Sequence, residues 1–203
     1  QKIETKIKEV LVSSGLSEVY TYGFVSMKDL EKSNISKDLI EKSITIMNPL
    51  SDEYKLMRPT TIPSMMQILA TNANYKNQDV KLFDISRSYK NINNEIEQGE
   101  VPLQENILTI GMYGDDTDFY TLKGLIENVL QAASINRYDI QKQRENESYH
   151  PGRCAEIKVG IDTIATFGEV HPELLDNYDI GKRAYLAEVN ITKLVKYSKA
   201  NKK

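Results

Sequence analysis

The spacing of the strand-like segments is the feature that most limits how this chain of 203 residues can fold. Short runs that alternate apolar with polar residues, or that are rich in aromatic and β-branched residues, are typical of β-strands. Two such runs meet at "GIDT", where Gly160 and Asp162 suit a tight hairpin turn. The predicted strands are 18–25, 43–48, 80–90, 106–114, 138–144, 154–160, 163–170 and 184–191.

Three longer segments have helical rather than alternating periodicity. Residues 2–14 form the first predicted helix, with Gly15 suited to end it and with an apolar face made of Ile3, Ile7, Val10 and Leu11. The other two longer helices are predicted at 62–73 and 119–134. Two short helices are predicted at 27–33 and 172–178. Because the helices do not alternate regularly with the strands, we predict an α+β fold, with an antiparallel sheet flanked by helices.

Charge and composition exclude several classes of protein. The formal net charge of −3 is against a dedicated nucleic-acid-binding protein. The sequence has no run of eighteen apolar residues that would span a membrane, and no secretory signal pattern. Its single cysteine fits a reducing compartment. We therefore expect one cytoplasmic module, residues 1–203, cut from a longer polypeptide, with any internal boundary near 91–105.

The stretch "YHPGRCAE" combines a histidine with the sole cysteine, an arginine and a glutamate. A nucleophile pair of Cys154 and His150 would need a third group to orient it, and Pro151 restricts His150 to an extended backbone. Gly152 permits a sharp turn. We therefore interpret the residues before Cys154 as a structural turn that leads into a strand, not as a catalytic dyad.

Motifs for phosphate and metal binding are absent from the sequence. It has no GxxxxGK[ST] and no GxGxxG between a strand and a helix. Zinc sites usually take four clustered ligands, whereas His150 and His171 are far apart in the sequence. His171–Pro172 is interpreted as a strand end that leads into a helix. We predict no metal site and no catalytic residue in this chain.

Six stretches occur in an order that resembles the beta subunit of bacterial phenylalanyl-tRNA synthetase. They are "GLSEVYTYGF", "NPLSDEYKLMRPTTIPSMMQILATN", "VKLFDISRSYK", "DFYTLKGLIENVL", "HPGRCAEI" and "FGEVHPELLDNYDI". The resemblance covers nearly the whole chain and implies a catalytic-like module with the class II synthetase catalytic fold. The signature residues that we interpret as structural are Arg58, Arg87, His150, Pro151, Gly152, Arg153, Glu156, His171 and Pro172.

The resemblance also implies that three class II motifs have degenerated. The matching positions are Tyr22 for the proline of motif 1, Lys90 and Ile92 for the arginine and glutamate of motif 2, and Glu188, Asn190 and Lys193 for the glycines and arginine of motif 3. An ammonium cannot copy the bidentate grip of a guanidinium on phosphate. A glutamate at a glycine position would repel phosphate.

What the resemblance implies for function is a non-catalytic scaffold that pairs with a catalytic alpha subunit. The α2β2 phenylalanine–tRNA ligase would use ATP and magnesium to charge tRNA-Phe, with no cofactor in this segment and no contact with a membrane. The interface candidates are Ile3, Ile7, Val10, Leu11, Tyr20 and Tyr22, although the helical stripe could serve the core instead or as well. Two alternatives are an active ATP-binding domain that uses Lys90 and Lys193, and a module that contacts tRNA.

Overall fold

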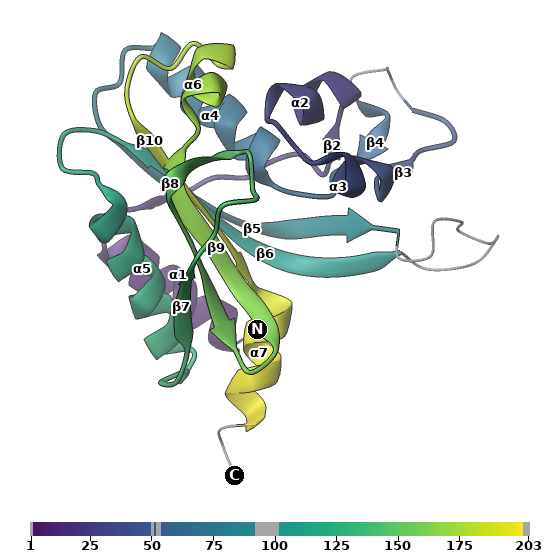
Figure 1. Ribbon diagram of the computed structural model, residues 1–203. Coiled ribbons are helices and arrows are strands. Elements are labelled where there is room, and N and C mark those ends of the chain that lie inside the picture. The colour runs from purple at the N-terminus through teal and green to yellow at the C-terminus, as the bar shows by residue number, and fades with distance from the viewer. Residues whose placement is uncertain (1, 50, 52–53, 92–101, 201–203) are drawn as a thin grey trace.

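The computed structural model describes residues 2–49, 51, 54–91 and 102–200. A seven-stranded sheet with the order β1-β5-β6-β10-β9-β8-β7 forms its main layer (Figure 1). The strands are β1 Ser17–Glu18, β5 Val80–Lys90, β6 Leu103–Tyr113, β7 Asp139–Lys142, β8 Tyr149–Val159, β9 Asp162–Val170 and β10 Ala184–Asn190. All neighbours pair antiparallel except β1 and β5, which are parallel.

Three helices pack on what we call the back face of this sheet. They are α1 Lys2–Ser13, α5 Phe119–Ala132 and α7 Ile191–Ala200. Helices α1 and α5 contact each other, whereas α7 contacts β6 and β9 (Figure 1). Their apolar side chains meet alternate strand residues in one buried cluster, in which the Phe167 ring stacks on Phe119 with 5.2 Å between the ring centroids.

Helix α1 ends as the sequence predicts. Gly15 adopts a φ of +88°, a left-handed conformation that glycine tolerates best. The Gly15 N–H donates to the Val12 carbonyl at 3.0 Å, and the Leu16 N–H donates to the Leu11 carbonyl at 3.1 Å. These two bonds form a Schellman motif, which satisfies carbonyls that a helix end leaves unpaired.

The opposite, front face is covered by α4 Ile62–Asn74 and α6 Pro172–Asn177. Helix α4 packs closely on β6, because a Cβ placed on Gly111 would lie 2.4 Å from the Met65 Cγ. A second, three-stranded sheet lies beside this face (Figure 1). Its strands are β2 Phe24–Val25, β4 Leu56–Met57 and β3 Ile44–Thr45. The short helices α2 Met27–Lys32 and α3 Lys37–Glu41 lie next to this small sheet (Figure 1).

The predicted strand at 18–25 is wrong as a single element. The chain follows the main sheet only as far as Val19, whose N–H donates to the Phe83 carbonyl at 2.8 Å. It then crosses to the small sheet, where the Gly23 carbonyl accepts the Arg58 N–H at 3.1 Å. Two short strands, β1 and β2, therefore replace one long strand. The strand predicted at 43–48 is also shorter, because only β3 pairs.

The predicted turn before Cys154 is also wrong. His150, Pro151, Gly152 and Arg153 all belong to β8, and Gly152 is not among the glycines with positive φ. The pairing with β9 shifts register between Tyr149 and Cys154, so the segment is an irregular strand and not a turn. Gly168 on β9 accommodates it, since a Cβ there would lie 2.3 Å from the Arg153 carbonyl oxygen.

Two helices have no counterpart in the sequence prediction. One is α3, and the other is α7, whose buried residues Ile191 and Leu194 join the back-face cluster. The predicted helices at 27–33, 62–73, 119–134 and 172–178 are confirmed as α2, α4, α5 and α6. The boundary considered near 91–105 mostly concerns residues outside those that the structure describes.

Candidate functional site

Three of the degenerate motif positions, Lys90, Glu188 and Asn190, lie on the front face. Lys90 at the end of β5 forms an ion pair with Glu105 on β6, with 3.3 Å between Nζ and Oε2. The Asn190 amide donates to the other oxygen of the same carboxylate at 2.7 Å. Glu105 is buried, with 8% of its surface exposed. One buried carboxylate therefore occupies both Lys90 from the motif 2 position and Asn190 from the motif 3 position.

Glu188 lies on the same face, on β10 in the middle of the sheet. Its Oε1 accepts hydrogen bonds from the Thr60 hydroxyl at 2.7 Å, the Thr61 N–H at 2.8 Å and the Thr61 hydroxyl at 2.6 Å. The Thr61 hydroxyl also meets the Thr109 hydroxyl of β6. The glutamate at the motif 3 position therefore fastens the segment before α4 to the sheet.

Helix α7 begins at the motif 3 positions as well. The Asn190 Oδ1 accepts the Lys193 N–H at 2.9 Å, an N-cap bond that satisfies one free donor of the helix start. The Lys193 ammonium lies 3.8 Å from the Asp162 carboxylate, to which Tyr197 also donates at 2.7 Å. The Tyr197 hydrogen bond, followed by the nearby lysines, lowers the pKa of Asp162.

None of the described cavities matches an ATP site built on these residues. Cavities of about 630, 430 and 310 Å³ open on the described part of the chain, and Arg87, Lys90 and Lys193 line none of them. The smallest lies beside Glu188, and Glu145 and Glu147 also line it. Three carboxylates at one cavity disfavour a phosphate. Ile92 lies outside the described residues.

The signature arginines serve the fold in different ways. Arg58 is 1% exposed, and burial lowers the pKa of its guanidinium. It donates to the Arg87 carbonyl at 2.9 Å, the Thr21 hydroxyl at 2.5 Å and the Ser64 hydroxyl at 3.2 Å. The Arg87 side chain points to the surface, where it donates to Gln104 at 3.3 Å. Arg58 therefore joins β5, α4 and the segment that crosses between the sheets.

The charged residues of "YHPGRCAE" pair within the chain. Arg153 lies 3.1 Å from the Glu169 carboxylate, and Glu156 lies 3.0 Å from the Lys158 ammonium. The His150 Nδ1 accepts the Gly152 N–H at 3.0 Å. Burial raises the pKa of the Cys154 thiol to about 12, so it stays protonated at neutral pH and is a poor nucleophile. This geometry disfavours the catalytic dyad.

His171 and Pro172 start α6, as the sequence analysis expects. The His171 Nδ1 accepts the Glu173 N–H at 3.1 Å, so the imidazole caps the helix. Among the described residues, no group of three or more His, Cys, Asp or Glu side chains could hold a metal ion. Nor does any described helix combine the length and apolar character needed to cross a membrane.

The interface candidates on α1 are buried or half-buried within the chain itself. Ile7 and Leu11 are 0% exposed and belong to the back-face cluster, and Ile3 packs partly against it. Val10 is half-buried. Val12 on the solvent side of α1 is 57% exposed, although the sequence analysis did not select it. The chain's own core therefore uses the centre of the predicted stripe, and α1 retains a small apolar outer surface.

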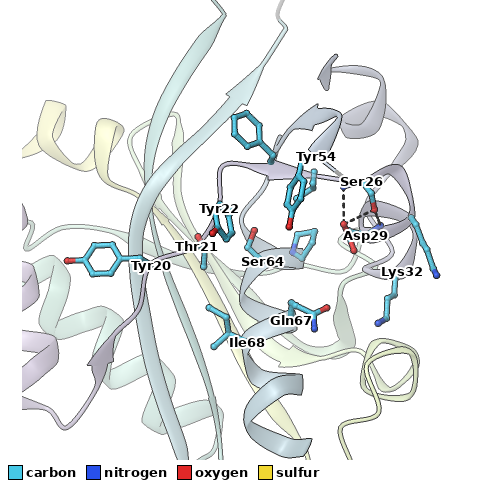
Figure 2. A pocket seen from close by; sticks show the side chains of 14 residues that line it. Tyr20, Thr21, Tyr22, Ser26, Asp29, Lys32, Tyr54, Ser64, Gln67 and Ile68 are labelled. Carbon is cyan, nitrogen blue, oxygen red and sulfur yellow. Dashed lines mark hydrogen bonds between the residues drawn. The ribbon is translucent and has the colours of Figure 1, made fainter. Parts of the chain in front are cut away.

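Tyr20 and Tyr22 are the most exposed of the interface candidates, at 83% and 77%. They lie on the crossing segment, at the cavity of about 630 Å³ that we call the aromatic groove (Figure 2). In Figure 2, Tyr20 projects away from the labelled side chains around Tyr22 and Tyr54. Other residues lining the groove are Phe24, Val25, Lys28, Lys32, Pro63, Ser64, Gln67 and Ile68.

Sequence reasoning missed the groove although one signal was present. Tyr20, Tyr22 and Phe24 recur at every second residue, and Lys28 and Lys32 follow with helical spacing. Tyr54 comes from a distant part of the sequence, and only the fold brings it to within 6.1 Å of Tyr22, measured between ring centroids.

Comparison with known proteins identifies the relatives of this chain. Residues 1–191 match the family model described as phenylalanyl tRNA synthetase beta chain CLM domain. The phenylalanine–tRNA ligase beta subunit of Clostridium acetobutylicum is 38% identical over 96% of this chain and 24% of its own length. That of Clostridium tetani is 38% identical over 100% of this chain and 25% of its own length. The chain thus spans about a quarter of these relatives.

Solved structures support the fold independently. Two structures of pyrrolysyl-tRNA synthetase from Desulfitobacterium hafniense superpose with TM-scores of 0.78 and 0.77 at 16% identity. Each alignment covers 98% of this chain, and 66% and 68% of the respective structures. The expected class II synthetase fold is therefore confirmed.

Proposed function

This chain belongs to the family of phenylalanyl-tRNA synthetase beta chains, and we propose that it serves there as a non-catalytic scaffold that pairs with the catalytic alpha subunit. The complete enzyme would be a cytoplasmic α2β2 phenylalanine–tRNA ligase that uses ATP and magnesium to charge tRNA-Phe. In this proposal, the module contributes a folded surface to the assembly, and the alpha subunit carries the chemistry.

The observation that carries the proposal is the pairing of charges on the front face. A class II site needs guanidinium groups that are free to grip phosphate oxygens. Here Lys90 pairs with Glu105, and Lys158 pairs with Glu156. Arg58, the only buried arginine among the described residues, donates its hydrogen bonds to the protein itself. Glu188, in turn, is bonded to the segment that covers the sheet.

The surface that we propose for the alpha subunit runs from α1 to Tyr20. Lys8 and Glu18 form an ion pair that joins α1 to β1, and Tyr20 is close enough to Lys8 to raise its pKa, after the larger effect of Glu18. The exposed Val12 and Tyr20 side chains provide apolar area outside the core. Interfaces of obligate complexes are rich in apolar and aromatic residues.

Co-elution tests this surface directly. We expect the chain to elute with a purified alpha subunit in size-exclusion chromatography, and the double variant V12D/Y20D to lose that co-elution while retaining its thermal unfolding transition. Tyr75→Asp is the matched control, because Tyr75 is 78% exposed at the end of α4. If the chain and alpha subunit stay separate while both are folded, the scaffold proposal is wrong.

ATP titration separates the scaffold from the alternative of an active ATP-binding domain. We expect no calorimetric signal for ATP with magnesium at micromolar protein concentration. Binding in the micromolar range that Lys90→Ala abolishes would favour the enzyme alternative. A change confined to the stability of the Lys90→Ala variant would instead reflect the lost ion pair with Glu105.

A further inference from the structure

We propose that the cavity of about 310 Å³ beside Glu188, which we call the acidic cavity, binds an aliphatic diamine. One ammonium group lies between the Glu188 carboxylate and the Tyr149 hydroxyl, the other lies at Glu145 and Glu147, and the methylene chain joins them. The acidic cavity shares no lining residue with the aromatic groove or with the α1 surface proposed for the alpha subunit. The scaffold role does not require this site.

Four segments that are distant in the sequence enclose the acidic cavity. They are the residues around α3, the start of α4, the loop between β7 and β8, and the middle of β10. Hydrogen bonds hold the loop in place, since the Asn34 amide donates to the Glu147 carbonyl at 3.4 Å and the Ser148 hydroxyl donates to the Ser33 carbonyl at 2.8 Å. The tertiary structure therefore forms this cavity, whose volume is at the lower end of the range for small-ligand sites.

The charged side chains among the described residues that line the acidic cavity are all carboxylates. Glu145, Glu147 and Glu188 form no ion pair with any residue that the structure describes. Arg58 interacts with Glu188 only at longer range, because its guanidinium donates its hydrogen bonds to other groups. The cavity therefore concentrates negative charge without a paired cation, which favours a positively charged ligand.

The placement of the carboxylates favours two separate ammonium groups over one metal ion. Among the described residues, no group of three or more His, Cys, Asp or Glu side chains could hold a metal ion. Glu188 is half-buried on β10, whereas Glu145 and Glu147 are exposed on the loop between β7 and β8. The negative charge thus lies at two depths, which a ligand with two separated positive charges can match.

Apolar side chains line the same cavity and suit the chain between the two charges. Ile35, Leu39 and Ile62 are part of the lining, and Ile35 and Ile62 are 8% and 2% exposed. Methylene groups are stabilised by contact with such a surface, while an ammonium group at the end of the chain stays hydrated or paired. An inorganic cation gains nothing from these side chains, and an amino acid would bring a further carboxylate to the cavity. The lining therefore favours an aliphatic chain with a positive charge at each end.

Two unused polar atoms mark the inner ammonium position. The hydrogen bonds that Glu188 accepts from Thr60 and Thr61 all go to Oε1, and Oε2 has no hydrogen-bond partner among the described residues. The Tyr149 hydroxyl is also without a partner in the part of the chain that the structure describes, although this residue is only 1% exposed. A buried hydroxyl that makes no hydrogen bond costs stability, so a donor placed there is favourable.

Tyr149 lies beside the acidic cavity. It follows Ser148, which lines the cavity, and its ring belongs to the buried cluster on the front face, the face on which Glu188 also lies. Burial, followed by the charge of Glu188, raises the pKa of the Tyr149 hydroxyl, which agrees with a hydroxyl directed toward that carboxylate. An ammonium group between the two residues can donate to both oxygens.

Calorimetric titration with putrescine and with cadaverine tests the proposal, at an ionic strength of about 0.15 M to screen non-specific attraction. We expect saturable binding of at least one of these diamines. The control n-butylamine lacks the second ammonium and should bind about 2- to 30-fold more weakly, the range for losing ion pairs with two exposed carboxylates. The control γ-aminobutyrate carries a carboxylate in place of one ammonium and should not bind. No binding of either diamine, or equal binding of n-butylamine, would overturn the proposal.

Variants of the three carboxylates locate the site. The double variant E145Q/E147Q should weaken diamine binding by about 2- to 30-fold, and Glu188→Gln by about 10- to 160-fold, because the half-buried carboxylate makes the stronger charged hydrogen bond. Asp116→Asn is the matched control, since it removes an exposed carboxylate that does not line the cavity. Thermal unfolding of each variant shows whether the fold is retained. Equal affinity of E145Q/E147Q and Asp116→Asn for the diamine would contradict the proposed site.

Tyr149→Phe distinguishes a ligand contact from a structural role. No described residue bonds the Tyr149 hydroxyl, so the variant should keep the thermal stability of the unaltered chain while its affinity for the diamine falls by about 2- to 13-fold. Unchanged affinity would rule out the inner ammonium position. The V12D/Y20D variant should bind the diamine normally, so a failure of diamine binding leaves the alpha-subunit proposal to its own test.

Discussion

The two faces of the seven-stranded sheet differ in what their buried residues do. On the back face, α1, α5 and α7 meet the strands through side chains that are almost all apolar. On the front face, buried polar groups at Asp84, Glu105 and Thr109 lie next to the apolar cluster under α4. The back face is explained by stability alone. On the front face, the buried polar groups bind the protein itself.

Breaking the back face should have the largest effect. Phe167 is 0% exposed and stacks on Phe119, so Phe167→Ala removes a large buried ring and leaves a cavity. We expect the free energy of unfolding to fall by about 3–5 kcal/mol, measured by urea denaturation. Val12→Ala, which truncates an exposed apolar residue on α1, is the control. A loss below about 1 kcal/mol would mean that the back face is not the principal core.

Breaking the front face should cost less but should act locally. Glu188→Ala leaves the Thr60 and Thr61 hydroxyls and the Thr61 N–H without their acceptor. We expect a loss of about 1–3 kcal/mol and faster amide exchange in α4, the helix that this segment starts. Glu188→Gln keeps one acceptor and should lose less. Uniform exchange in Glu188→Ala would contradict the fastening role assigned to Glu188.

The smallest effect at neutral pH concerns a thiol at the front-face cluster, and this effect grows as the pH rises. In the folded chain Cys154 stays protonated up to about pH 12, whereas in the unfolded chain it ionises near 9.0. The unfolded state therefore binds fewer protons above pH 9, and stability falls as the pH rises through this range. Urea denaturation from pH 8 to pH 11 should show a shallower decline for Cys154→Ser, with a difference within about 1 kcal/mol at pH 8. Identical slopes would mean that the thiol is accessible in the folded state.

Local sequence patterns predicted those parts of the fold that local interactions determine. The helix end at Gly15 and the hairpin at Gly160 both form within a few residues, and each is confirmed. The segment at 18–25 was mispredicted because its partners, Phe83 and Arg58, are distant in the sequence. The irregular start of β8 depends on Gly168 of the neighbouring strand, which no reading of "YHPGRCAE" alone reveals.

In the candidate site as well, the contacts between residues distant in the sequence were not predicted. The structure brings Lys90, Glu188 and Asn190 to one face, a grouping that the sequence did not predict, and their partners Glu105 and Thr61 carry no motif. Tyr54 also lines the aromatic groove, and the sequence pattern of residues 20–32 does not include it. Pairwise contacts across the sheet and between the two sheets decide whether a polar residue binds a ligand or the chain itself.

The position of β10 has a consequence for biosynthesis. This strand lies between β6 and β9, yet it is the last strand of the described chain to leave the ribosome. Until residues 184–190 emerge, the β5–β6 hairpin and the β7–β8–β9 unit have no common neighbour, and the long edges of β6 and β9 remain unpaired. Such edges are templates for pairing with other chains. The nascent protein therefore passes through an aggregation-prone interval, which ends when one late strand joins two preformed halves.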